Sequence, residues 1–362
     1  MKKNEYYTLD AILKYDADYS VIFGERSNGK TTACVAYGIK KYIESGHVEQ
    51  FAIIRRWEED LKGANIKQMF TGILIERIKL WTHGEYNNVT CFSGQAFLSK
   101  FNEKGDKIKQ DSKPFCFLFS ISAEEHKKST SYPYVTTIIF DEFLTRGLTL
   151  NDEFVKFQNL LSTIIRQRDN VKIFMLGNTV NKYSEYFNEM GLTNIRKMKK
   201  GTIDLYTYGE SELRVAVEYS DFPAKKKKSD KYFAFNNPKL KMITTGSWEI
   251  DIYPHLPYKY LPKEVLFTFY INFKGEKFTC PVINHGNDVI IFIHRKTTPI
   301  IEDEYPVYST DIKPNYNYSC NLLRPRNKVE TLILALFKEK KVFYQDNDVG
   351  ETIRAFINWC SE

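Results

Sequence analysis

Short apolar runs separated by helical stretches dominate the first 217 residues of the chain. Each run is bounded by charged residues or glycine, as strands buried in a parallel sheet tend to be. Residues 30–43, in contrast, carry apolar side chains at helical spacing. Strands that alternate with helices predict an α/β fold with a central, mainly parallel sheet over 1–217. The predicted strands lie at 20–23, 51–54, 137–140 and 172–176.

The pattern changes in the second half of the chain. A proline followed by four lysines at 223–228 marks a basic connector over 218–258, which is either a solvated linker or a loop that faces a polyanion. Three strand-like runs separated by turn residues then predict an antiparallel meander, and two helical stretches follow it. This order predicts a separate small α+β domain over 259–362. Its strands are expected at 266–273, 277–283 and 288–293, and its helices near 326–341 and 350–361.

Composition narrows the class of protein. No apolar run reaches the roughly 20 residues of a membrane span, and the charged start leads into no apolar signal core, so we expect a cytoplasmic protein without a membrane partner. The six cysteines are scattered without a CxxC pair, which favours reduced thiols. A formal charge of +7 is compatible with a polyanionic partner but does not require one.

A phosphate-binding motif lies between the first strand and the first helix. Residues 24–31 match G-x-x-x-x-G-K-[ST] in full, which predicts a P-loop NTPase rather than an ordinary strand–helix turn. Backbone N–H groups and the helix N-terminus would surround phosphate oxygens, Lys30 would contact the β- and γ-phosphates, and Thr31 would ligate Mg²⁺. We therefore predict ATP and Mg²⁺ as cofactors. The residues expected to bind the nucleotide are Gly24, Arg26, Ser27, Asn28, Gly29, Lys30, Thr31 and Thr32.

Polar side chains end two further strands. The run 137–140 leads directly into Asp141 and Glu142. Beside a P-loop, Asp141 would bind Mg²⁺ and Glu142 would take a proton from the attacking water, whereas in isolation the pair would be ordinary surface acids. The glutamate favours hydrolysis over phosphate transfer. Asn178 ends the next strand. Its amide could sense the γ-phosphate or orient the attacking water, and the alternative is a turn residue.

Several cations are candidates for phosphate or DNA contacts. Arg166 and Arg168 follow an amphipathic helix, where a ring ATPase could present an arginine to the neighbouring subunit, although solvated surface is the alternative. Arg26 could contact phosphate within its own loop. The pairs at 55–56 and 127–128 are either solvated or contact phosphate or DNA.

With these residues placed, the chain resembles the DNA-packaging ATPases (encapsidation proteins) of small short-tailed bacteriophages with protein-primed linear genomes, a family related to large terminase subunits. The resemblance covers most of residues 5–180, and beyond residue 220 it rests on element order. It is carried by Tyr7, Lys14-Tyr15-Asp16, the P-loop with Arg26, Arg55-Arg56, Lys128 to Pro133, Ile139 to Phe143, Arg166, Arg168 and Asn178.

The resemblance implies a homo-oligomeric ring, a pentamer, that sits transiently on the portal (connector) of an empty capsid in the host cytoplasm and drives double-stranded DNA inward. It implies that Arg166 is a trans-acting finger and Lys128 a second trans-acting cation, with Tyr7 and Tyr15 near the adenine. Where the family can carry a basic residue facing the DNA channel, this chain has 57–60, Trp-Glu-Glu-Asp. The residues that contact DNA are therefore not identified.

The resemblance also implies that the last domain has a vestigial ribonuclease-H-like fold. A two-metal nuclease needs several converging carboxylates, but the strand 266–273 contains no acid and the next two strands offer only Asp288. We expect a docking domain without nuclease activity, whose partner is the portal, a structural packaging RNA or a neighbouring subunit. The predicted function is an ATP-driven packaging motor. The alternative is a nucleotide-dependent DNA-binding ATPase of the helicase-loader type, without sustained translocation.

Overall fold

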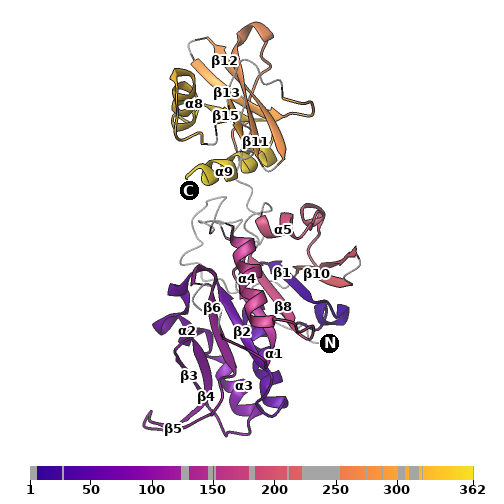
Figure 1. Cartoon of the computed structure of the whole chain (residues 1–362), viewed down its shortest axis with the longest axis vertical. Coiled ribbons are helices and arrows are strands. Elements are labelled where there is room, and N and C mark those ends of the chain that lie inside the picture. Colours follow the sequence, from indigo (N-terminus) through magenta and orange to yellow (C-terminus); the bar gives the residue numbers. More distant parts are fainter. Residues whose placement is uncertain are drawn as a thin grey trace. The chain divides into compact units, whose positions relative to one another are not determined.

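The computed structural model divides into two compact units, Met1–Glu249 and Ile250–Glu362, which we describe separately (Figure 1). Within the described parts of the chain, no helix is long and apolar enough to cross a bilayer. The basic stretch at 223–230 lies outside the described residues. Those residues are 6–26, 28–123, 130–145, 150, 152–178, 184–209, 212–221, 253–273, 275–286, 288–300, 306–309, 318–319 and 321–361.

The first unit is built on one large sheet, in the order β3-β4-β6-β2-β7-β8-β1-β10-β9, with β5 paired to β4. The predicted mainly parallel sheet is confirmed, and the four strands expected from the apolar runs lie side by side at its centre. The parallel strands are β6 (Cys116–Ser120), β2 (Gln50–Arg55), β7 (Val135–Asp141), β8 (Lys172–Asn178), β1 (Tyr19–Gly24) and β10 (Leu213–Ser220). Antiparallel strands at the edges are β3 (Asn88–Phe92), β4 (Gln95–Phe101), β5 (Lys107–Gln110) and β9 (Thr202–Tyr208).

Helices cover both faces of this sheet. On one face α1 (Lys30–Glu44), α2 (Gly63–Met69) and α3 (Ile73–Trp81) contribute to a buried apolar cluster, and on the other α4 (Glu153–Ile165) and α5 (Glu185–Glu189) contribute to a second. Successive residues of a strand point to opposite faces, so Ile53 packs in the first cluster and Ile54 in the second. Short 3₁₀ helices are η1 (Ile12–Tyr15), η2 (Glu58–Leu61) and η4 (Ile195–Lys197).

The register of the central strands brings their carboxyl ends to one edge of the sheet. Gly24 at the end of β1 lies opposite Asn178 of β8, and Asp141 at the end of β7 lies opposite Leu176. Ligands of parallel α/β sheets bind at this edge. The P-loop motif and the polar strand ends are therefore neighbours in space although they are far apart in the sequence.

The second unit contains the predicted meander. Strands β11 (Val265–Phe273), β12 (Glu276–His285) and β13 (Asp288–Arg295) pair antiparallel, and a buried cluster joins the sheet to α8 (Lys328–Lys338) and α9 (Asn347–Ser361). The Asn327 side chain accepts a hydrogen bond from Glu330 N, so α8 begins at an N-cap that the sequence provides. The sequence pattern missed the short strands β14 (Val307–Ser309), β15 (Tyr318–Ser319) and β16 (Val342–Tyr344), and η6 (Pro262–Glu264) precedes β11.

Candidate nucleotide-binding site

The two glycines of the motif are required by the backbone for different reasons. Gly29 has φ +96°, a conformation that glycine adopts without steric cost, and it directly precedes α1. Gly24 ends β1, where an added Cβ would lie 3.0 Å from Ser220 O of the neighbouring strand. The loop between them therefore turns tightly and presents the N-terminus of α1, which favours anions.

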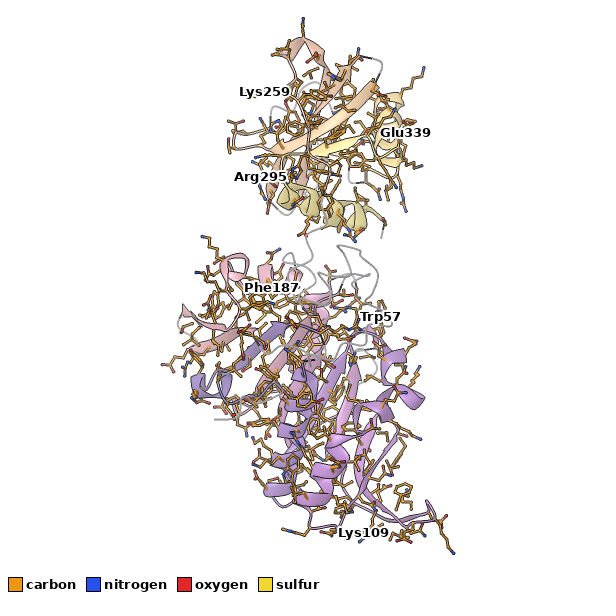
Figure 2. All side chains as sticks on the ribbon, turned by 180° about the vertical axis from the view of Figure 1, so that it is seen from behind. Trp57, Lys109, Phe187, Lys259, Arg295 and Glu339 are labelled. Carbon is orange, nitrogen blue, oxygen red and sulfur yellow. The ribbon has the colours of Figure 1, made fainter. Side chains whose placement is uncertain are left out.

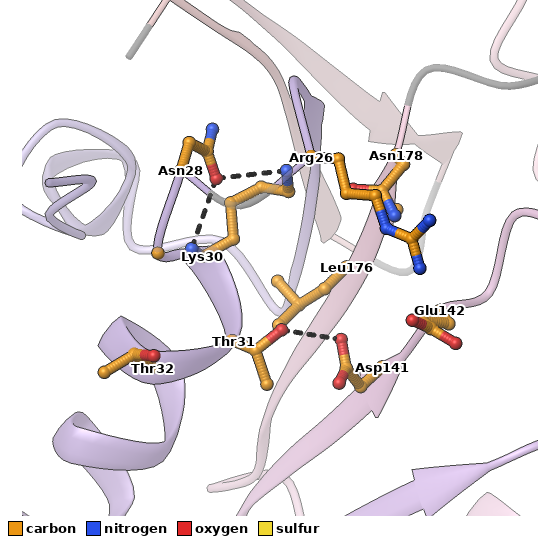
Figure 3. Close-up of a pocket in the computed structure, with 11 residues that line it drawn as sticks. Arg26, Asn28, Lys30, Thr31, Thr32, Asp141, Glu142, Leu176 and Asn178 are labelled. Carbon is orange, nitrogen blue, oxygen red and sulfur yellow. Dashed lines mark hydrogen bonds between the residues drawn. The ribbon is translucent and has the colours of Figure 1, made fainter. Parts of the chain in front are cut away.

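A cavity of about 240 Å³ opens over this loop (Figure 3). It brings together most of the residues that the sequence analysis selected, whereas Gly24, at the end of β1, does not line it and Ser27 lies outside the described residues. Leu176 and Gly177 were missed because they contribute through their place beside the P-loop rather than through reactive groups. The lining residues are Arg26, Asn28, Gly29, Lys30, Thr31, Thr32, Asp141, Glu142, Leu176, Gly177 and Asn178.

Lys30 is a buried cation whose ammonium group bonds to its own loop. Its side chain is 5% exposed, and Nζ donates to Glu25 O at 2.7 Å and to Asn28 Oδ1 at 3.1 Å. Burial lowers the pKa of Lys30 from 10.5 to about 8, although Asp141 and Glu25 oppose the shift. An anion in the cavity would restore the solvation that the ammonium lacks.

Thr31 and Asp141 form the part of the site that fits a divalent cation. Thr31 Oγ1 donates to Asp141 Oδ1 at 2.9 Å, which places a hydroxyl and a carboxylate oxygen together at the cavity wall. Asp141 is 3% exposed, and burial raises its pKa above 3.8, while Arg55 and the hydrogen bond from Thr31 oppose this. A few oxygen ligands with room for water and phosphate oxygens is the donor set that Mg²⁺ prefers.

Arg55 lies against the two carboxylates at the end of β7. Its Nη2 is 2.7 Å from Asp141 Oδ2, its Nη1 is 2.9 Å from Glu142 Oε2, and its side chain is 17% exposed. Pairing of β2 with β7 places Ile54 beside Phe140, so the next residue of β2 reaches the acids. The sequence left open a solvated or phosphate-facing role; the structure gives Arg55 two anionic partners instead.

Arg56 has a different set of partners from Arg55. It is 6% exposed and forms a two-point ion pair with Glu153, the first residue of α4. Of the alternatives that the sequence left open for Arg56, the structure thus excludes a solvated side chain. Arg55 is the last residue of β2 and Arg56 directly follows it. Successive residues of an extended chain point to opposite sides, which separates the two guanidinium groups. The following Trp57, labelled in Figure 2, precedes the acidic η2. Its exposed fraction is 38%.

The two arginines that follow α4 are not equivalent. Arg166 is exposed, has φ +54°, and donates through Nη2 to Thr130 O at 3.2 Å. The guanidinium of Arg168 binds the backbone. It donates to five carbonyl oxygens, those of Tyr132, Pro133, Val135, Ile164 and Ile165. Neither arginine lines the cavity of its own chain, and Lys128 lies outside the described residues.

The tyrosines expected near the adenine do not line the cavity. Tyr7 is 3% exposed, its N–H donates to Asn28 O, and its hydroxyl donates to the buried Glu218 Oε2 at 2.6 Å. Tyr15 is half-buried and packs against the apolar cluster of α1. Tyr6 also lies against the loop, since a Cβ added at Gly29 would lie 3.4 Å from its Cδ1. The adenine contact itself stays a prediction.

Comparison with known proteins finds similarity to phage packaging proteins. The family model described as podovirus DNA encapsidation protein (Gp16) matches residues 1–356. The DNA packaging protein of Bacillus phage B103 is 32% identical over 184 residues, which are 50% of each chain. That of Bacillus phage phi29 is 28% identical over 190 residues, 52% of this chain and 50% of the relative. The chain therefore spans about half the length of the curated relatives it matches.

Two solved structures share the fold over nearly the whole chain. The bacteriophage Phi-29 viral genome packaging motor assembly contains a chain with a TM-score of 0.61 at 19% identity, covering 98% of this chain and 100% of that one. The Phi-28 gp11 DNA packaging motor gives a TM-score of 0.57 at 15% identity, covering 98% of both. At these identities the likeness is one of fold.

Proposed function

Because the chain belongs to the podovirus DNA encapsidation protein family, we propose that it is an ATPase that drives double-stranded DNA into a preformed capsid. The observation that carries the proposal is the meeting of a P-loop lysine, a hydroxyl, a buried carboxylate and a second carboxylate around one cavity. These are Lys30, Thr31, Asp141 and Glu142. They are the groups that ATP hydrolysis requires.

The residues divide the chemistry between them. Lys30, Arg26 and the backbone N–H groups of the loop bind the phosphates. Thr31 and Asp141 would hold Mg²⁺, which when bound offsets phosphate charge. Glu142 accepts a proton from the attacking water while the bond between the β- and γ-phosphate breaks, and ADP and phosphate are released.

Glu142 can act as the base only when its carboxylate is available. In the structure Oε2 is paired with Arg55 Nη1 at 2.9 Å, so the guanidinium occupies this oxygen. The side chain is nevertheless 52% exposed, so the carboxylate is accessible from the cavity side. To act as the base, Glu142 would turn from Arg55 towards the γ-phosphate.

A ring assembly would complete the site. Arg166 is exposed at the end of α4 and outside the cavity of its own chain, which supports its role as a finger that enters the neighbouring subunit's site. Lys128 would be a second cation supplied in the same way. This part of the proposal is a homo-oligomeric ring, a pentamer, located on the portal of the capsid in the host cytoplasm. The fold shared with the Phi-29 packaging motor supports it.

The second unit is proposed as a docking domain with a vestigial ribonuclease-H-like fold. Its antiparallel meander, extended by β14 parallel to β11, supports that fold, and β11 contains no carboxylate for a metal. Its partner would be the portal, a structural packaging RNA or a neighbouring subunit.

Packaging can be measured directly with purified protein, empty capsids, ATP and linear duplex DNA. DNA that becomes protected from added nuclease, and that stays unprotected with Lys30→Ala, is the expected result. The alternative, a helicase-loader-type ATPase, would give DNA-stimulated hydrolysis without protected DNA or movement along the duplex.

A further inference from the structure

The geometry points to Arg56 and Glu153 as a positioning pair: they fix the backbone of Glu142 and join it to α4, the helix that Arg166 directly follows. This inference rests on the proposed function, in which Glu142 is the base and Arg166 the finger. Neither member of the pair lines the cavity, so neither is a catalytic residue.

The pair is buried and geometrically specific. Arg56 Nε lies 2.7 Å from Glu153 Oε2 and Nη2 lies 2.8 Å from Oε1, which is the two-point contact that only a planar guanidinium makes. Glu153 is fully buried and Arg56 is 6% exposed. Charges held so far from water require complete pairing, and Arg56 completes it with backbone carbonyls.

Those carbonyls belong to the catalytic segment. Arg56 Nη1 donates to Glu142 O at 3.3 Å and Nη2 donates to Phe143 O at 2.8 Å. Glu142 has φ +61°, a left-handed conformation that costs a residue with a Cβ and persists only when its surroundings hold it. On the other side, Phe143 N donates to Leu176 O of β8. The turn that aims Glu142 is thus held by β8 and by Arg56.

Glu153 extends this contact to the helix. Its Oε2 accepts from Leu150 N at 2.9 Å and its Oε1 accepts from Tyr186 OH at 2.8 Å. The same residue begins α4, a helix whose last residue directly precedes Arg166. A shift of α4 that moves Arg166 would pull on Glu153, and through Arg56 on the carbonyl of Glu142. Helix α4 therefore links Glu142, the base of its own site, to Arg166, the finger that enters the neighbouring subunit's site.

Single-turnover hydrolysis of ATP by the full chain tests this role, with Arg56→Lys, Glu142→Gln and their double variant. Lysine keeps the charge but cannot bond both carboxylate oxygens and both carbonyls. Misplacement of a catalytic group by about 1 Å costs up to about 100-fold, so Arg56→Lys should lower the rate about 10- to 100-fold while the Kd for ATP changes less than about twofold. If Arg56 acts through Glu142, the same change should lower the residual rate of Glu142→Gln less than about twofold.

Two further variants separate positioning from folding. Asp111→Asn is the matched control, because Asp111 is a buried carboxylate bonded to Tyr42 and His47 away from the cavity; it should lower Tm and leave the rate unchanged. Tyr186→Phe removes one hydrogen bond to Glu153 and should slow hydrolysis less than Arg56→Lys does. If the lysine variant does not fold, the slower rate of Tyr186→Phe alone tests the pair.

Three results would overturn the inference. An unchanged rate in Arg56→Lys would do so, and so would an equal loss in the wild-type and Glu142→Gln backgrounds, which is the mark of a merely structural residue. A wild-type chain that does not hydrolyse ATP would overturn the proposed function and this inference together, whereas the first two results leave the proposed function standing.

Discussion

Arg55 and Glu142 form an ion pair in which Nη1 and Oε2 are 2.9 Å apart, and the other nitrogen of the same guanidinium, Nη2, is 2.7 Å from Asp141 Oδ2. One cation thus neutralises both acids that end β7. Because Asp141 is almost fully buried and Glu142 is half-exposed, losing Arg55 affects the two carboxylates unequally.

Arg55→Ala should destabilise the protein by about 3 kcal/mol at pH 7.5, because it leaves a buried carboxylate without its cation. Burial already raises the pKa of Asp141 above 3.8 and Arg55 opposes this, so removing Arg55 raises that pKa further. When the pKa of a carboxyl is higher in the folded than in the unfolded protein, the fold becomes less stable as the pH rises above the unfolded-state pKa. The destabilisation by Arg55→Ala should therefore be smaller at pH 5 than at pH 7.5. Thermal unfolding without Mg²⁺ measures the destabilisation at the two pH values. The control is Lys40→Ala, which removes an exposed ion pair with Glu44 and should change stability by less than about 0.5 kcal/mol. An equal loss at both pH values would contradict this account of Asp141.

Lys30→Ala and Glu142→Gln should both reduce hydrolysis to a small residual rate but differ in binding. The first removes a phosphate cation and should weaken ATP binding. The second leaves Thr31 and Asp141 in place, so ATP should bind and persist. Fluorescent-nucleotide titration and phosphate release distinguish the two, and near-normal turnover by Glu142→Gln would remove it as the base.

ATP affinity should fall as pH rises above about 8. Burial lowers the pKa of Lys30 to about 8, and only the protonated ammonium binds phosphate well. At pH 9 about one tenth of the free protein carries that proton, so the apparent Kd should be about tenfold higher than at pH 7. Calorimetry at pH 8.5 in buffers of different ionisation enthalpy should show proton uptake on binding. Uptake that is absent would place the lysine pKa well above this range.

Arg166→Ala and Arg168→Ala should fail for different reasons. Arg166 makes one exposed contact, so its loss should leave Tm unchanged while slowing hydrolysis about 10³-fold or more if it is a finger. Arg168 bonds five carbonyls, and its loss should destabilise the fold by about 2 kcal/mol.

Mixed assemblies test whether Arg166 acts in trans. Combining Arg166→Ala with Glu142→Gln subunits creates interfaces where an intact base meets an intact arginine from the neighbour, so hydrolysis should partly return. If co-assembled mixtures are as inactive as both parents, Arg166 does not act in trans and is a solvated surface residue.

The full chain should not cut DNA with Mg²⁺ or Mn²⁺. Strand β11 contains no acid, and Asp288 at the start of β13 is exposed and paired with Lys341 at 3.4 Å. A gel assay of plasmid DNA checks this. Metal-dependent cleavage that Asp288→Asn abolishes would show that the second unit is a nuclease.

The sequence alone determined the parts of the site that are local along the chain. The P-loop occupies eight consecutive residues, and its glycines are needed for a turn and a close approach that the motif itself encodes. Asp141 and Glu142 were identified because an apolar strand ends at them. The spacing of the motif residues and the run of apolar residues are properties of the sequence, so both can be identified without the folded structure.

Only the tertiary structure decided which partners the arginines have. Arg55 and Arg56 are adjacent and alike in the sequence, yet one meets Asp141 and Glu142 and the other meets Glu153. Arg55 ends β2 and Arg56 directly follows it, so their side chains point to opposite sides of the sheet. Which strand or helix lies on each side depends on a strand order that joins residues about ninety positions apart. Tyr7 meets Glu218 for the same reason. Burial then requires each of these charged or polar groups to be paired, and only the packed sheet supplies the partner.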